Sequence, residues 1–170
     1  MPEPESQRQP VPRVDGDEIA VALAFLGFAR ECVVKKTEGL GDDALRRAVV
    51  PTGTNLLGLV QHLAASERFW FAHHVAGEPL PEPFDDDDFF SMTVPADRAA
   101  ADVIADYRAA AARSDEIVRA VGDPGAPMAR AVDGRTLPLR WALAHVTGET
   151  TRHAGHADIL RELLDGTTGR

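Results

Sequence analysis

The chain has 170 residues, of which 44% are hydrophobic, and a formal net charge of −9. This length suits one domain with a buried core and is too short for two domains. The negative charge argues against nucleic acid as a partner, because a phosphate backbone needs a basic surface. The sequence has no apolar run of about 18 residues, no secretory signal and only one cysteine, so we expect a cytoplasmic protein without a membrane-spanning helix.

Residues 1–14 contain four prolines and few large apolar side chains, which predicts a disordered tail. A first helix is expected from Asp15 or Asp17 up to the glycines at 39 and 41. Its apolar residues recur every three or four positions, as in a helix with one buried face. These residues are Ile19, Leu23, Leu26, Ala29, Val33 and Val34.

Two further helices follow in chain order. The first should begin at Thr52 or Thr54, either of which can cap a helix, and should end near Ala76, ahead of a Gly and a Pro. The second should begin at Pro95, a residue type favoured at the first helical position, and should continue to about Val121. Its many alanines permit close packing, which favours a homodimer.

The remaining segments connect these helices and add a last one. An acidic loop is expected over residues 78–92, and a small hairpin or an irregular loop around the Asp-Gly step of residues 128–138. A fourth helix is predicted for residues 137–164. Four long helices with long connections predict an all-α four-helix bundle, here over residues 15–168.

Residues that can bind metals recur along the predicted fourth helix: His145, Glu149, His153 and His156. At about 100° per residue they fall within roughly 80° of one another. The same stripe continues into Leu160 and Leu163, which are core residue types, so the four polar side chains should point inward. Because an unpaired charge inside a protein is costly, a metal ion is a natural partner for them.

Glu149 and His153 lie one helical turn apart, a spacing at which both can reach one ion. A catalytic site usually has three protein ligands and an open position, so a third ligand should come from another helix. His62 is the best candidate, since its neighbours on the second helix are apolar. His73 lies about 16 Å further along that helix, too far to share the ion, and His74 should be solvated.

Several neighbours have more than one role open to them. His156 could donate a hydrogen bond to a ligand, transfer a proton or replace a ligand. Arg152 could receive an anionic substrate or form a surface salt bridge, and His145 should line the pocket or accept a helix hydrogen bond. The acidic run 85–88 lacks the alternating ligands of a calcium loop and should be solvated surface, while Cys32 should be a small buried residue.

Two stretches of the sequence resemble the DinB-like superfamily. Residues 52–70 (TGTNLLGLVQHLAASERFW) resemble its second helix, and residues 148–163 (GETTRHAGHADILREL) resemble its fourth helix. Within that superfamily the chain is similar to the "mini-circle protein" group, a domain of unknown function, over about residues 15–168. The resemblance implies a four-helix bundle with a divalent metal in its core, usually zinc or nickel.

The resemblance also implies a ligand set and a type of chemistry. In many DinB-like proteins all three ligands are histidines, whereas the mycothiol-dependent maleylpyruvate isomerases use two histidines and a glutamate. The motif match carries this second pattern onto His62, Glu149 and His153. Similar bundles act as thiol-dependent transferases or isomerases, in which the metal lowers the pKa of a thiol such as mycothiol or bacillithiol. No residue that would hold the thiol follows from the match.

Three functional hypotheses remain open from the sequence. The first is a metal-dependent enzyme acting on a small-molecule substrate, with zinc or else nickel, mycothiol as co-substrate, and His156 or Arg152 assisting at the rim of the site. The second is a non-catalytic metal-binding bundle with a structural or stress-response role. In the third, the histidines form a buried polar network without metal, and each then needs a hydrogen-bond partner.

Overall fold

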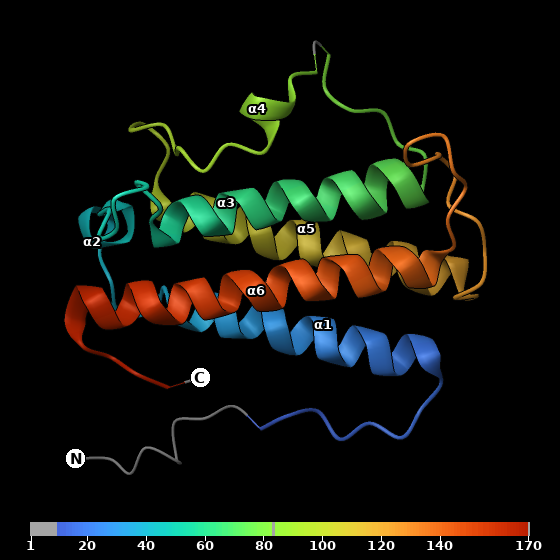
Figure 1. The fold of residues 1–170 in the computed structure, drawn as a ribbon, viewed down its shortest axis with the longest axis horizontal. Helices are drawn as coiled ribbons and strands as arrows, with labels where there is room; N and C mark the ends of the chain where they lie inside the picture. The colour runs from blue at the N-terminus through green and yellow to red at the C-terminus, as the bar shows by residue number, and fades with distance from the viewer. Residues whose placement is uncertain (1–9, 83, 170) are drawn as a thin grey trace.

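The computed structural model describes residues 10–82 and 84–169. Its long helices lie side by side as a bundle (Figure 1): α1 (Glu18–Lys35), α3 (Leu56–Glu67), α5 (Ala100–Val121) and α6 (Leu139–Asp165). The π-helical segment η2 (Arg68–Val75) continues α3, and two short helices, α2 (Asp42–Arg46) and α4 (Asp86–Phe89), lie in the connections. The predicted all-α four-helix bundle is therefore confirmed.

The N-terminal part of the predicted tail, residues 1–9, lies outside the described residues, and residues 10–14 contain no helix or strand. Helix α1 starts where the sequence predicted. Asp17 caps it, since its side chain accepts a hydrogen bond from the amide of Ala20 at 2.8 Å. Among the described residues, no helix combines the length and the apolarity that crossing a membrane requires.

Two predicted helix starts are wrong by a few residues. Helix α3 is capped by Asn55, whose side chain accepts from the amide of Gly58 at 2.9 Å, and not by Thr52 or Thr54. Helix α5 starts at Ala100 instead of residue 95. The guanidinium of Arg46 explains the second difference, because it binds the carbonyls of residues 94, 95 and 98 and so holds this segment outside the helix.

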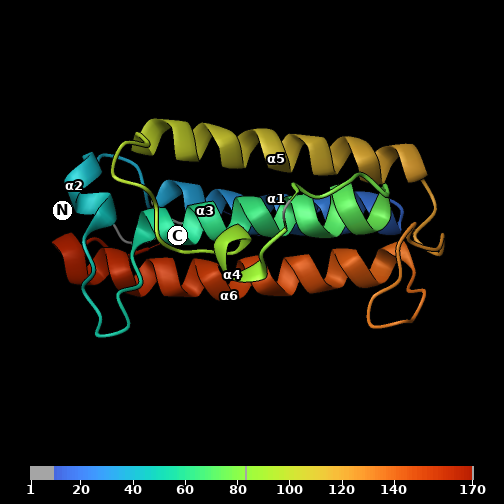
Figure 2. The ribbon, with the colours of Figure 1, turned by 90° about the horizontal axis from the view of Figure 1, so that it is seen from above.

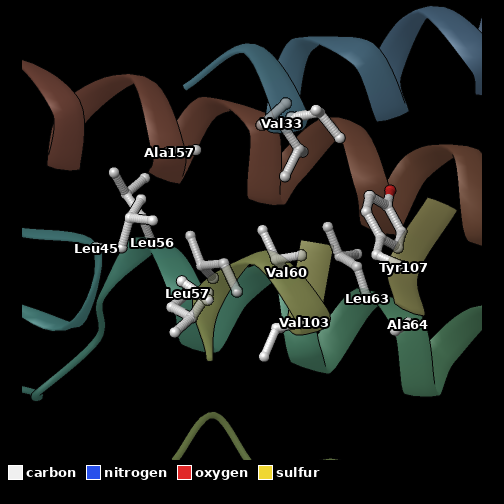
Figure 3. Packing of buried hydrophobic residues seen from close by; sticks show 14 of the residues in the cluster. Val33, Leu45, Leu56, Leu57, Val60, Leu63, Ala64, Val103, Tyr107 and Ala157 are labelled. Atoms are coloured by element: carbon white, nitrogen blue, oxygen red, sulfur yellow. The ribbon is translucent and has the colours of Figure 1, made fainter. Parts of the chain in front are cut away.

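Helix α1 packs mainly along α6, and α3 packs mainly along α5 (Figures 1 and 2). The buried side chains form two apolar clusters. Figure 3 shows the first, in which Leu56, Leu57 and Val60 of α3 meet residues of α1, α5 and α6. The second cluster lies around Leu26, Phe71 and residues 139–146. Leu163, a predicted core residue, is instead 57% exposed on α6.

Along each long helix, the residues of the first cluster are separated from those of the second by buried polar side chains. We call these side chains the polar layer: Arg30, Glu67, Ser114, Thr150 and His153. At its centre the guanidinium of Arg30 donates to both carboxylate oxygens of Glu67, at 2.7 and 2.8 Å. It also donates to Asp115 of α5 at 2.7 Å. Burial disfavours the charged guanidinium, but the bonds to the two carboxylates outweigh it and raise the pKa of Arg30.

The connection between α5 and α6 contains the small hairpin-like turn that the Asp-Gly step allowed. Asp133 and Gly134 both have positive φ, 48° and 74°, as a two-residue turn between paired chains requires. Isolated bridges pair residue 127 with 138 and residue 132 with 135. The connection is held on the end of η2, where the amides of Ala129 and Arg130 donate to the carbonyls of residues 75 and 74.

The π-helical segment changes which side chains face inward beyond residue 67. A π-helix turns less per residue than an α-helix, because each amide bonds the carbonyl five positions back. The amide of Ala76, for example, donates to the carbonyl of Phe71 at 2.9 Å. The prediction that His74 is solvated assumed α-helical winding and is wrong: its side chain is buried, stacks on Trp70 and donates to the carbonyl of Arg130.

Burial makes His74 a source of acid sensitivity. Burial, together with the charges of His73 and Arg130, lowers the pKa of His74, and the bond to the Arg130 carbonyl opposes this only in part. The unfolded chain, with an ordinary pKa of about 6.5, therefore binds this proton more readily than the folded chain. The stabilising effect of the neutral side chain is complete above about pH 6.5 and is lost as the pH falls.

We therefore expect the His74→Phe variant, which keeps the stacked ring, to be less sensitive to acid. The loss of melting temperature between about pH 7.5 and about pH 5.5 should be smaller than in the wild type. Both proteins should be measured with a chelator present, so that metal does not contribute. An equal loss in the two proteins would contradict the assignment.

Candidate metal centre

Two helices bring His62, Glu149 and His153 together. One potential ligand atom from each residue lies within 4.8 Å of the other two. The carboxylate oxygen Oε1 of Glu149 is 3.0 Å from Nε2 of His153 and 3.5 Å from Nε2 of His62. His62 comes from α3, whereas the other two residues lie one turn apart on α6. The three residues singled out from the sequence thus converge on one point.

The spacing of these atoms suits a small divalent cation. Tetrahedral zinc ligands, each about 2.1 Å from the ion, are about 3.4 Å from one another. The two distances from Oε1 of Glu149 to the imidazole nitrogens, 3.0 and 3.5 Å, lie close to this value. Two imidazoles and one carboxylate also form a donor set typical of catalytic zinc sites, in which a fourth position remains open. The residues present therefore fit a divalent metal ion such as zinc.

The main chain determines how His62 faces this point. Its Nδ1 lies 3.0 Å from the carbonyl oxygen of Phe90, in the segment that follows α4. Because a carbonyl can only accept, Nδ1 must carry the hydrogen, and Nε2 then has a free electron pair on the side of Glu149. The ring of Phe90 also lies 6.0 Å from the imidazole. A hydrogen bond from the ring nitrogen that does not bind the metal commonly orients such histidines.

Glu149 is oriented by a different partner on each oxygen. Its Oε1 faces the two histidines, and its Oε2 accepts from the guanidinium of Arg152. Burial opposes ionisation of the carboxyl group, but the neighbouring His153, Arg152 and His62 outweigh this and keep the pKa of Glu149 below its ordinary value. Glu149 is therefore an anion at neutral pH, and Arg152 is an exposed side chain at the rim.

His153 is buried, and burial lowers its pKa, although the charge of Glu149 opposes the effect. Its Nδ1 lies 3.2 Å from Nδ1 of His156. His156 itself is exposed, so the prediction that its side chain points inward is wrong. It lies three positions beyond His153, where the helix surface turns toward solvent, but it still reaches the back of the His153 ring.

Aromatic rings continue from the cluster of His62, Glu149 and His153 along the same side of α6. The ring of His145 stacks on Trp141 at a centroid distance of 4.9 Å and lies against Trp70 of η2 at 4.6 Å. Burial lowers the pKa of His145, although the charge of Glu149 acts in the opposite direction. His145 is thus held one turn from Glu149 by two tryptophans, as part of the wall beside the centre.

A cavity of about 490 Å³ lies on another side of η2, next to α5. Its lining includes Arg68, His73, Leu80, Phe89 and Arg113. The ring of Phe89 lies 5.1 Å from that of Phe90, the residue whose carbonyl binds His62. His73, which the sequence argument excluded from the ligand set, belongs to this cavity, and its Nδ1 donates to the carbonyl of Glu78 at 2.8 Å.

The other marked residues lie where the sequence suggested. The acidic run 85–88 is exposed, although it forms the short helix α4 and not a loop, with Asp85 capping the amide of Asp88 at 3.0 Å. Cys32 is buried and belongs to the first apolar cluster.

Two features of this region carried no signal in the sequence: the carbonyl of Phe90 as the partner of His62, and the buried pair of Arg30 with Glu67.

The model of the family described as mycothiol-S-transferase matches residues 21–166. This span contains His62, Glu149 and His153, together with almost the whole bundle. No curated protein matches the chain.

Proposed function

This chain belongs to the mycothiol-S-transferase family, a DinB-like family, and from that premise we propose that it joins mycothiol, through its sulfur atom, to an electrophilic small molecule with the help of a divalent metal ion. The convergence of His62, Glu149 and His153 carries the metal part of this proposal. The match to the mycothiol-S-transferase family supports mycothiol as the thiol. Zinc is the metal we propose first, with nickel as the alternative.

A bound zinc or nickel ion would supply Lewis acidity. A thiol at the open coordination position of the ion would then have a lowered pKa. Glu149 contributes one negative charge, which partly offsets the charge of the cation, and the two neutral imidazoles add none. The ring of Phe90 lies 6.0 Å from that of His62, and the ring of His145 lies against Trp70, so aromatic side chains border the centre.

The residues at the rim have supporting roles in this proposal. Nδ1–H of His153 would donate to Nδ1 of His156, which keeps Nε2 of His153 available to the metal. Arg152 holds the second oxygen of Glu149, so that only Oε1 faces the centre. In the reaction itself the thiol releases its proton to solvent, the sulfur electron pair forms the carbon–sulfur bond, and the leaving group departs with the electron pair of the bond that breaks.

Protein loaded with zinc should accelerate the reaction of mycothiol with a chromogenic aryl halide such as 1-chloro-2,4-dinitrobenzene, followed by absorbance of the thioether product. Bacillithiol and glutathione serve as comparison thiols, and metal-free protein should lose the acceleration. Glu162→Gln, an exposed change on α6, is the control variant. Folded protein that binds zinc but accelerates none of these thiols would favour the non-catalytic metal-binding bundle.

Protein that stays folded and takes up neither zinc nor nickel would remove the metal part of the proposal. The histidines would then form a polar network. The cytoplasmic location and the homodimer stay predictions.

A further inference from the structure

Residues 90–93 lie along α3 and are attached to it through their main-chain carbonyls, so we call this segment the carbonyl strap. The carbonyl of Phe90 accepts from His62 at 3.0 Å. The side-chain amide of Gln61 donates to the carbonyls of Ser91 and Thr93, at 2.9 and 3.1 Å. Two neighbouring residues of α3 therefore bind three of the four carbonyls in the strap.

The fourth carbonyl explains a glycine inside α3. A Cβ atom added to Gly58 would overlap the carbonyl oxygen of Met92, so no side chain fits there without moving the strap. Glycine inside a helix costs about 1 kcal/mol relative to alanine, so a close main-chain contact is a physical reason to have it there. Gly27 of α1 differs, because a Cβ there would meet nothing within 4 Å.

The amide of Gln61 is held in one orientation. Its oxygen accepts from the guanidinium of Arg98 at 3.2 Å, which leaves its nitrogen to donate to the strap. Arg98 is in turn bound to Asp106 of α5 at 2.9 Å. The position of the strap is therefore set by side chains of α3 and α5 as well as by the close contact at Gly58.

We propose that Gly58 and Gln61 are positioning residues for the metal ligand His62. They fix the carbonyl strap, its Phe90 carbonyl binds Nδ1–H of His62, and Nε2 is thereby kept on the side of Glu149 and His153. This inference rests on the proposed metal function and assigns a role to two residues that cannot themselves reach the ion. Loss of a hydrogen bond that orients a metal-binding residue typically weakens metal binding by about 10- to 100-fold.

The test compares Gly58→Ala and Gln61→Met with Gly27→Ala, the matched glycine replacement in open space. Methionine keeps the length and the helix propensity of glutamine but donates no hydrogen bond. Zinc affinity is measured by competition with a chelating dye, and folding by the melting temperature of metal-free protein. The visible spectrum of bound Co²⁺ reports the ligand geometry, which a purely structural weakening of the bundle would leave unchanged.

We expect both α3 variants to bind zinc about 10- to 100-fold more weakly and to alter the Co²⁺ spectrum, while Gly27→Ala behaves as the wild type. If Gly58→Ala does not fold, Gln61→Met decides. Wild-type affinity and spectrum in the folded α3 variants would overturn the inference and leave the proposed function intact. A wild-type chain that binds no metal would instead remove the proposed function, and this inference with it.

Discussion

Replacing Glu67 with glutamine is expected to lower the free energy of unfolding by about 3 kcal/mol, the lower end of the range for breaking a buried ion pair. The two side chains of the Arg30–Glu67 pair are only 7% and 1% exposed, and the replacement keeps the volume while it removes the charge. Arg30 would then remain buried with Asp115 as its only carboxylate partner among the described residues. Chemical denaturation of metal-free protein measures the change.

Two further variants separate the charge effect from other causes. Glu116→Gln makes the same chemical change at an exposed position of α5 and should alter stability by less than about 0.5 kcal/mol. Replacing both Arg30 and Glu67 with methionine should recover most of the loss, because a buried pair is often replaced by apolar residues at little cost. If Glu67→Gln is as stable as the wild type, the buried pair does not stabilise the fold in the way described.

Replacing Glu149 with glutamine is expected to weaken zinc binding by about a hundredfold or more. Binding energies of about 10–16 kcal/mol for sites with four ligands correspond to roughly 3 kcal/mol per ligand. Glutamine keeps the shape of the side chain but removes the negative charge that lies 3.0 and 3.5 Å from the two imidazoles. Competition with a chelating dye at fixed pH gives the affinity of both proteins.

The controls for this prediction lie on the same helix. Glu162→Gln should bind zinc as the wild type does, because residue 162 is exposed and remote from the centre. Arg152→Gln should have a smaller effect than Glu149→Gln, since Arg152 contacts only the second oxygen of Glu149. A Glu149→Gln protein that is folded and binds zinc like the wild type would exclude Glu149 as a ligand.

The sequence predicted the bundle and the convergence of the site because both depend on helical periodicity. Glu149 and His153 share one face of an α-helix whatever the rest of the chain does, and α6 is regular over its whole length. His62 was selected from a second helix because its neighbours there are apolar, and the resemblance to DinB-like proteins gave the same residue. The prediction that His156 points inward is wrong because residue spacing along a helix gives the direction of a side chain only to within part of a turn.

The residues that support the site could not be predicted in the same way. The partner of His62 is a main-chain carbonyl, and every residue has one, so Phe90 carries no distinguishing mark in the sequence. The π-helical segment changed the winding beyond residue 67 and brought His74 inside against the α-helical prediction. Arg30 and Glu67 look like ordinary surface charges in the sequence, since their burial depends on three helices meeting at one level.

The ion pairs of the polar layer also restrict how α1, α3 and α5 can slide past one another. If α1 shifted along the bundle by one helical turn, about 5.4 Å, the guanidinium of Arg30 would leave Glu67 and face apolar side chains. The leucine-rich clusters on either side would tolerate such a shift far better, because apolar contacts are not directional and one can replace another. We infer that these charges select a single alignment of α1, α3 and α5, and with it the level in the bundle at which α3 presents the imidazole of His62.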